Sequence, residues 1–378
     1  MYDQIREDIF FILLYGVVTT MAAMASCYLL FRQGNAFAAD IKTPARLRKW
    51  TGVFFAVSAL GHLWYLPILF LTSSKAIKIS YACAMLDILL FFPLAIVVML
   101  TMLQDRRRPL WPIGAAVLPP AIGMVWCLVS GSEAVVPAIY AYLLLLGILL
   151  ILYMLRALRQ YRRWLLDNYA DLEHKEVWQS FVVVVFILSL LGFYTFGDGG
   201  LAYEYIVQIS GGVLICYLLW RVETLSDLSI SQSLSSLEDL KDFNRQGLGL
   251  SPMDDSTLNH STSPPDNIGS LLQQNCIDTQ LYLQHDLTVI QLAKVIGTNR
   301  LYLSQYFSSQ GMTYNTYINN LRISHFVRLY REAVATQRNF TVKQLAYDSG
   351  YRSYSTFSLA FKQRMGLSVT VWINDSDK

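Results

Sequence analysis

Five polar side chains that can bind a proton or a small polar ligand lie within long apolar runs of this 378-residue sequence: His62, Tyr65, Asp87, Glu204 and Gln208. A polar group inside a membrane helix is costly, so it indicates a function unless it only bonds a neighbouring helix. Counted from the ends of their runs, His62 and Asp87 would lie roughly 12–13 Å from the outer surface. A His62–Asp87 hydrogen bond that only joins two helices is the favoured interpretation. A sensory pocket for an unknown small ligand or other signal comes next, and a transport path last.

A second polar group, His174 with Glu173 and Glu176, is similar to a metal or phosphoacceptor cluster. Its place in a basic loop favours solvated surface instead. The five cysteines show no CxxC spacing, and the sequence contains no phosphate-binding glycine loop. We therefore expect no metal, no cofactor and no enzyme activity.

Seven apolar runs must position the polar side chains. Each is close to the about 20 residues that cross a membrane as a helix. The 54% hydrophobic content also exceeds the roughly 45–50% of soluble domains. Residues 1–221 are therefore predicted to form a seven-helix transmembrane bundle, kinked at Pro119 and Pro120, and to contact membrane lipid. The runs are roughly 9–31, 50–71, 79–103, 110–130, 135–155, 177–197 and 203–220.

The basic residues predict how this bundle is oriented. Fourteen of the seventeen Lys and Arg residues in 1–221 fall in loops 1–2, 3–4 and 5–6 or directly after the seventh run. Basic loops stay in the cytoplasm, so the N-terminus is expected outside and the C-terminus inside the bacterial inner membrane. The first run is longer than a signal-sequence core and follows the acidic leader MYDQIRED, which predicts a retained span.

Two segments of different character follow the seventh run. Residues 222–243 keep leucines at mixed three- and six-residue spacings in a polar context. This predicts a juxtamembrane helix that continues from the seventh run and lies near the membrane or pairs with a second copy in a homodimer. Residues 244–269 are rich in Ser, Pro, Asn, Asp and Gly, which predicts a flexible linker. The segments 1–221, 222–270 and 271–378 carry net charges of +4, −6 and +5, and the basic third segment suits an anionic partner.

Residues 270–378 contain one pattern twice. The copies read LTVIQLAKVIGTNRLYLSQYF from residue 287 and FTVKQLAYDSGYRSYSTFSLAF from residue 340. Each places an alanine (Ala293, Ala346) where two short helices would cross. Four residues later comes a glycine (Gly297, Gly350), where a turn needs positive φ. The copies therefore predict two helix-turn-helix units.

The second helix of each copy carries apolar anchors four residues apart, Leu303/Phe307 and Phe357/Phe361. Between the copies, residues 316–334 or so fit an unbroken helix of roughly 28 Å. Two second helices held about one DNA turn apart could enter successive major grooves. A helical domain kept for protein contacts is the alternative, and it leaves the duplicated polar surface unexplained.

The 53-residue offset of the two alanines resembles the DNA-binding domain of AraC/XylS regulators. The stretches GTNRLYLSQYF, YINNLRISHF and GYRSYSTFSLAFKQRMGLS share the resemblance, which covers about Leu271–Trp372 and says nothing about the apolar runs. It implies double-stranded promoter DNA and RNA polymerase as partners.

The resemblance also implies eight DNA-contacting residues: Arg300, Leu301, Ser304, Gln305, Arg352, Tyr354, Ser355 and Ser358. Arg300 would contact phosphate, and Gln305 could bond an adenine edge. The sequence departs from the family pattern at Leu359, where a basic residue is usual, at Phe326 and at Val369. Leu359 removes a strong base or phosphate contact, which weakens the expectation that the second unit reads bases.

The sequence thus predicts an all-α chain that joins a membrane sensor to a double helix-turn-helix domain, with the function of a one-component transcription regulator. The alternative is a transporter or membrane enzyme that carries a regulatory DNA-binding tail. The apolar runs show no internal repeat and no paired carboxylates, which disfavours this alternative.

Overall fold

The computed structural model describes residues 8–32, 34–38, 41–65, 73–130, 134–194, 200–228 and 267–376. Within these ranges the chain forms helices and loops, together with an isolated antiparallel β-bridge between Tyr169 and Thr288. The chain divides into two compact units. The first comprises Met1–Tyr161 and Val177–Ser229, and the second comprises Arg162–Glu176 and Ile230–Lys378.

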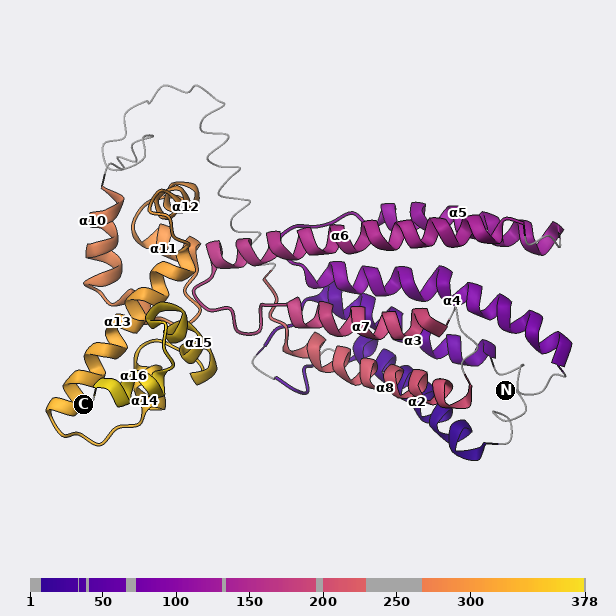
Figure 1. The fold of residues 1–378 in the computed structure, drawn as a ribbon. Coiled ribbons are helices and arrows are strands. Elements are labelled where there is room, and N and C mark those ends of the chain that lie inside the picture. Colours follow the sequence, from indigo (N-terminus) through magenta and orange to yellow (C-terminus); the bar gives the residue numbers. More distant parts are fainter. Residues whose placement is uncertain are drawn as a thin grey trace, which may run out of the picture. The chain divides into compact units, whose positions relative to one another are not determined.

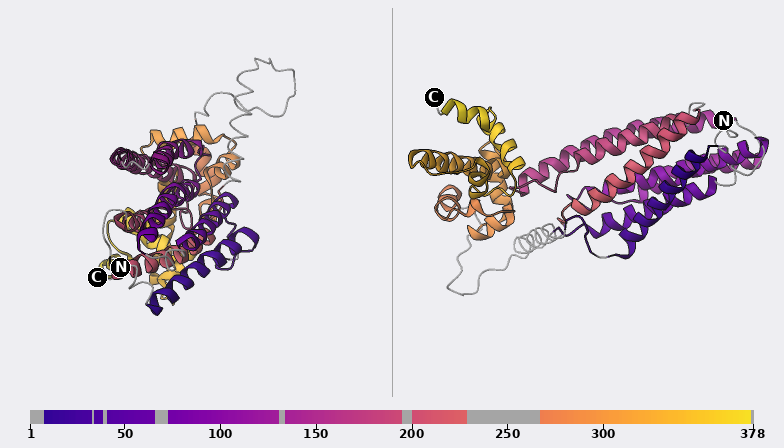
Figure 2. Two further views of the ribbon diagram at one scale, coloured as in Figure 1. Left: turned by 90° about the vertical axis from the view of Figure 1, so that its right-hand side faces the viewer. Right: turned by 90° about the horizontal axis from the view of Figure 1, so that it is seen from below.

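A helix lies in each of the seven predicted apolar runs, and the helices of the first unit run roughly parallel or antiparallel to one another (Figures 1 and 2). Among the described residues, α2, α6 and α8 are long and apolar enough to cross a membrane. Crossing by the other four helices stays a prediction. The bounds are α2 (Ile9–Phe31), α3 (Ala45–Tyr65), α4 (Ser73–Met102), α5 (Trp111–Ser130), α6 (Val136–Asn168), α7 (Trp178–Tyr194) and α8 (Leu201–Thr224).

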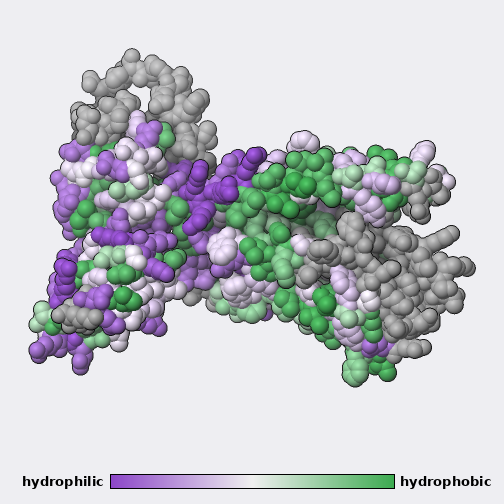
Figure 3. Space-filling model, viewed as in Figure 1, coloured by the Kyte–Doolittle hydropathy of each residue, from purple (hydrophilic) through white to green (hydrophobic). Residues whose placement is uncertain are grey.

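Large apolar side chains are exposed along α5 and α6. Ile122 and Val125 on α5 are 67% and 59% exposed, and Leu144 and Leu145 on α6 are 65% and 57% exposed. Figure 3 shows extensive hydrophobic surface over these helices. A soluble monomer rarely exposes so continuous an apolar surface, whereas contact with lipid requires one.

The prediction that the seventh run continues without a break into a juxtamembrane helix is wrong, because the helix ends after Thr224. Helix α8 ends at Thr224, and Leu225 is extended, with φ −85° and ψ 124°. Leu225 and Leu228 are buried in the first unit, so burial of these two leucines competes with helix continuation. Residues 229–243, which the prediction also covered, and the predicted linker up to residue 266 lie outside the described residues.

The second unit is built from short helices around one long helix, α13 (Tyr314–Ala335), which lies where residues 316–334 were predicted to be helical. One core forms around α11 and α12, and another forms around α14, α15 and α16. The other bounds are α10 (Ile268–Leu272), η2 (Gln273–Ile277), η3 (Leu281–Leu283), α11 (Val289–Val295), α12 (Arg300–Ser309), α14 (Val342–Asp348), α15 (Tyr354–Met365) and α16 (Val369–Ser376).

Candidate nucleic-acid interface

The first helix-turn-helix unit consists of α11 and α12. Thr288 begins α11 with a capping box: its hydroxyl accepts from the backbone N–H of Gln291, whose side-chain oxygen accepts from the N–H of Thr288. Gly297 in the turn has φ 73°, a conformation that glycine adopts without steric cost. The side chain of Asn299 then accepts a backbone N–H at 2.9 Å. These contacts make Arg300 the first residue of the second helix.

The second helix-turn-helix unit repeats this arrangement with α14 and α15. Thr341 caps α14, and Ser353 caps α15. Gly350 in the turn has φ 87°, and a Cβ there would lie 2.8 Å from the Cα and the carbonyl oxygen of Leu283. The predicted need for positive φ is confirmed at both turns, and at Gly350 a close backbone approach requires glycine as well.

The alanines and apolar anchors lie in the cores as predicted. Ala293 and Ala346 are 2% and 0% exposed. The anchors of the second helices, Leu303/Phe307 and Phe357/Phe361, are also buried. Each unit therefore presents one face of its second helix to a core and leaves the other face for a partner.

Phe326 on α13 fills the second core. Its ring centroid lies 4.5 Å from that of Phe357 and 5.7 Å from that of Phe361. Trp372 and Val369 pack in the same cluster. Two departures from the family pattern, Phe326 and Val369, are thus accommodated together by one set of packed side chains.

Of the eight residues that were predicted to contact DNA, four lie on α12, three lie in the first half of α15, and Arg352 lies in the turn before α15. Five are exposed: Leu301, Gln305, Arg352, Tyr354 and Ser355. Three are half-buried: Arg300, Ser304 and Ser358. Leu359 is 60% exposed on α15, so an apolar side chain occupies the outward position where a basic one is usual.

The end of α6 and the loop after it, residues 162–176 (the α6–α7 segment), belong to the second compact unit, together with the C-terminal domain. Sequence analysis did not predict this association. The N–H of Ala170 donates to the carbonyl of Leu287 at 3.2 Å. Asn315 Nδ2 donates to the carbonyls of Tyr169 and Ala170 at 3.1 and 2.8 Å. Ala170 is 1% exposed within the first core. Segments more than a hundred residues apart share no periodic pattern, so the sequence held no signal for this contact.

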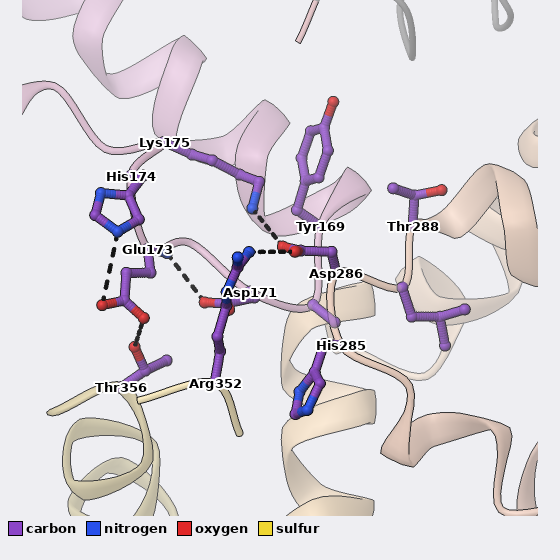
Figure 4. A network of polar contacts seen from close by, with 12 residues as sticks. Tyr169, Asp171, Glu173, His174, Lys175, His285, Asp286, Thr288, Arg352 and Thr356 are labelled. Atoms are coloured by element: carbon purple, nitrogen blue, oxygen red, sulfur yellow. Dashed lines mark hydrogen bonds and ion pairs between the residues drawn. The ribbon is translucent and has the colours of Figure 1, made fainter. Parts of the chain in front are cut away.

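Ionic contacts join the same segment to the start of α15 (Figure 4). Lys175 Nζ lies 3.0 Å from Asp286 Oδ1, and Arg352 Nη1 lies 2.9 Å from Asp286 Oδ2. Burial opposes ionisation of Asp286, but the two cations outweigh it and hold the pKa of this carboxyl below its ordinary value. Asp286 thus bridges the α6–α7 segment to a predicted DNA contact.

Glu173 corrects the expectation of a solvated surface around His174. A carboxylate oxygen of Glu173 accepts from the hydroxyl of Thr356 on α15 at 3.4 Å, and the other lies 3.9 Å from His174 Nε2 (Figure 4). The Glu173 side chain is only 26% exposed. Sequence analysis treated this group as surface because the partner lies on a distant helix.

Two charged residues, Arg322 and Asp171, are buried in the second compact unit. Arg322 on α13 is 1% exposed and donates to the carbonyls of Tyr282 and Gln284 at 2.7 and 2.8 Å. Burial lowers its pKa, and the negative charge of Asp171 in the α6–α7 segment is one of the groups that oppose this shift. Asp171 is itself 3% exposed. A buried cation therefore gains part of its electrostatic support from the α6–α7 segment.

The structure brings together part of the predicted polar set in the first unit. His62 Nε2 on α3 lies 3.1 Å from Gln208 Oε1 on α8, and His62 Nδ1 lies 2.8 Å from the carbonyl of Ser58. Glu204 and Gln208 are 8% and 7% exposed. The side chains of Tyr65 and Asp87 lie outside the described residues, so the His62–Asp87 pair stays a prediction.

A buried ion pair in the first unit also escaped sequence analysis. Glu223 near the end of α8 has a fully buried side chain, which lies 3.2 Å from Arg48 Nη1 and accepts from the hydroxyl of Tyr28 at 2.9 Å. The N–H of Ala36 also donates to it, at 2.7 Å. Arg48 is one of the fourteen basic residues that the sequence analysis used only to orient the bundle.

The comparison with known families agrees with the geometry of the second unit. Residues 292–375 match the family model of a helix-turn-helix domain. The resemblance of the C-terminal domain to AraC/XylS-type regulators is confirmed.

Two curated relatives match part of the chain. They are the TCP pilus virulence regulatory proteins of two Vibrio cholerae serotype O1 strains, classical Ogawa and El Tor Inaba, each 34% identical over 78 residues. The match covers 21% of this chain and 26% of each relative, so the chain spans about a quarter of the relatives' length. No solved structure matches the chain significantly.

Proposed function

We propose that this chain is a one-component transcription regulator integrated in the bacterial inner membrane, which binds promoter DNA sequence-specifically through two helix-turn-helix units. The observation that carries the proposal is the pair of capped helix-turn-helix units in a chain whose other unit exposes apolar helices. The relatives are named as regulatory proteins, which supports control of transcription, with RNA polymerase as a further partner.

The spacing of the two units suits B-form DNA. Helix α13 has 22 residues, which corresponds to about 33 Å at 1.5 Å per residue. Adjacent major grooves on one face of the duplex repeat every 34–36 Å or so. The α12 and α15 helices can therefore enter successive grooves while α13 lies between them.

The side chains of the two second helices differ in what they can read. Gln305 is exposed on α12 and can form a bidentate contact with adenine, whereas Arg300 at the first turn suits a phosphate. The turn before α15 offers Arg352 and the first residues of α15 offer Tyr354 and Ser355, but Leu359 replaces a basic contact. The first helix-turn-helix unit is therefore the main base reader in this proposal, and the second helix-turn-helix unit contributes mostly phosphate contacts.

The membrane part rests on the apolar helices and the distribution of basic residues. Seven spans would put the N-terminus outside and the C-terminal domain in the cytoplasm, as the basic loops predict. The contacts of the α6–α7 segment with the C-terminal domain support this orientation, because groups that touch must lie on the same side of the membrane.

The polar set in the first unit is the proposed sensor. His62 and Gln208 join α3 to α8 near the predicted outer half of the bundle, with Glu204 buried one turn earlier on α8. A ligand or proton that binds there can shift the bundle only by its differential affinity for two arrangements of these helices.

The proposal is tested with the full chain in lipid nanodiscs. Duplexes are selected from a random pool, and the affinity of the recovered site is compared with random duplex over a series of salt concentrations. We expect recovery of a shared sequence and a steep loss of affinity with salt. Gln305→Ala should cost about 1–3 kcal/mol and relax preference at one position, whereas Arg300→Ala should weaken all duplexes alike. Binding without any preference at every salt concentration would contradict the proposal.

A further inference from the structure

The α6–α7 segment contacts the C-terminal domain through backbone pairing and buried hydrogen bonds as well as through surface side chains. Its backbone pairs with the residues that begin α11, through the Tyr169–Thr288 bridge and the Ala170–Leu287 hydrogen bond. Asn315 of α13 donates to two of its carbonyls. Main-chain pairing and a buried amide give this contact a defined register that surface charges alone would not provide.

The same segment carries two carboxylates that act on the second helices, one by a hydrogen bond and one electrostatically. Glu173 accepts from Thr356 in the first turn of α15. Burial raises the pKa of Asp167 in the last turn of α6, and the positive charge of Arg300, the first residue of α12, opposes that shift. The N-terminal residues of such helices are the ones that contact base edges and phosphates when a helix-turn-helix unit docks.

A third contact holds a predicted DNA-binding cation. Arg352 pairs with Asp286, and Asp286 is also bonded by Lys175 of the α6–α7 segment. A guanidinium held by one carboxylate must exchange that partner before it can bind a phosphate oxygen. The α6–α7 segment thus acts on Arg300 and Thr356 through its own carboxylates, and it is linked to Arg352 only through the shared partner Asp286.

We propose that the α6–α7 segment is an autoinhibitory element, which occupies the DNA-facing ends of α12 and α15 and must leave before a duplex can bind. This inference rests on the proposed function. Its physical basis is that Glu173 accepts a hydrogen bond in the first turn of α15 and that Asp167 interacts electrostatically with Arg300 at the start of α12, which are the helix ends that contact DNA when such a unit docks. Fixed negative charges next to a polyanion repel it, and their hydrogen bonds must be broken before phosphate can replace them.

The segment also connects this inhibition to the membrane. Helix α6 is continuous from Val136 to Asn168, so the residues that contact the C-terminal domain follow directly from a candidate membrane span. A rotation or shift of α6 would carry Asp167 and Ala170 with it. A signal in the first unit can thus release the C-terminal domain without passing through residues 229–266.

The affinity test compares three forms of the full chain in lipid nanodiscs, with the duplex recovered by selection as the probe. Asp167→Asn with Glu173→Gln removes the two carboxylates with little change of shape. Asp278→Asn with Glu332→Gln removes the same charge from exposed sites outside the α6–α7 segment and both second helices. If the inhibited state outnumbers the free state about tenfold, the first double variant should bind about tenfold more tightly than wild type and clearly more tightly than the charge-matched control.

Hydrogen exchange in the wild-type chain provides a second readout that needs no substitution. Without DNA, the peptide that covers residues 168–176 should be protected, because the Ala170 N–H is bonded to Leu287. Saturating duplex should increase its exchange at least severalfold.

Two results would overturn autoinhibition alone: equal affinity of the two double variants, or protection of residues 168–176 that DNA leaves unchanged. In either case the α6–α7 segment would be a fixed strut that DNA binding tolerates. Failure of every form to bind any duplex would overturn the proposed function as well, so the two failures are distinguishable.

Discussion

Single residues in the turns and cores decide whether each helix-turn-helix unit forms. The two turn glycines were predicted from their spacing alone, because a sharp turn between helices needs positive φ. The close approach of Leu283 to Gly350 could not be predicted, since it depends on how a distant loop packs.

Gly350→Ala should strongly destabilise the second helix-turn-helix unit. An L-residue at φ 87° costs about 1–2 kcal/mol, and the added Cβ would also meet the Leu283 backbone at 2.8 Å. Gly311→Ala is the matched control, because its φ is 66° and no atom lies within 4 Å of a Cβ there. Pulse proteolysis of the full chain in urea should show a larger loss for Gly350→Ala; equal losses would mean that the close approach is unimportant.

Cys276 should behave as an inert thiol in the folded domain. It is fully buried, and burial raises its pKa to about 11. Between the ordinary thiol range and about pH 11 the unfolded chain ionises while the folded one stays protonated, so this site's contribution to stability is lost as the pH rises through that window. Iodoacetamide at pH 8 followed by mass spectrometry should leave Cys276 unmodified until urea unfolds the domain; rapid alkylation of the native chain would contradict its burial.

At the scale of elements, strong local signals were predictive and long-range contacts were not. The helices of the C-terminal domain follow from apolar spacing and from caps such as Thr288 and Thr341, which are local. The end of α8 at Thr224 was mispredicted, because burial of Leu225 and Leu228 in the first unit overrides a leucine pattern that fits a helix. The docking of the α6–α7 segment could not be predicted either, because its partners lie more than a hundred residues away in the sequence.

Phe326 should be essential to the packing of α13 against α15. It is fully buried, and its ring centroid lies 4.5 Å from that of Phe357. Phe326→Ala should therefore lower the free energy of unfolding by about 3–5 kcal/mol and loosen the packing of the second helix-turn-helix unit. Val334→Ala on the same helix removes a side chain that is 47% exposed and should cost much less. Hydrogen exchange should show faster opening of α14 and α15 than of α11 and α12 in Phe326→Ala; equal effects on both units would argue against two separate cores.

At the scale of the whole molecule, the account depends on where the chain crosses the membrane. Composition and the basic loops predict a seven-span unit with its N-terminus outside. Among the described residues, α2, α6 and α8 are long and apolar enough to span a membrane, so crossing by α3, α4, α5 and α7 and the orientation stay predictions. What the bundle senses could not be predicted, because a binding site depends on side chains that several helices bring together.

Reporter fusions test the predicted topology. Fusions after Asp105, Asn168 and Ser226 should report the cytoplasm, and fusions after Leu71, Ser132 and Gly199 should report the outside, because the basic loops are retained inside. A cytoplasmic signal at Gly199 together with an outside signal at Ser226 would put the C-terminal domain on the wrong side for DNA.

The central claim, that a membrane-integrated chain reads promoter DNA, is tested most directly by genome-wide mapping of the full-length protein in its own cells. The account predicts discrete promoter sites that share a sequence and are bound by protein recovered in the membrane fraction. Arg300→Ala should lower occupancy at all of them. Gln305→Ala should redistribute it, since phosphate contacts supply affinity and base contacts supply preference. A membrane-bound protein with no enriched sites, or with sites unaffected by both substitutions, would contradict the account.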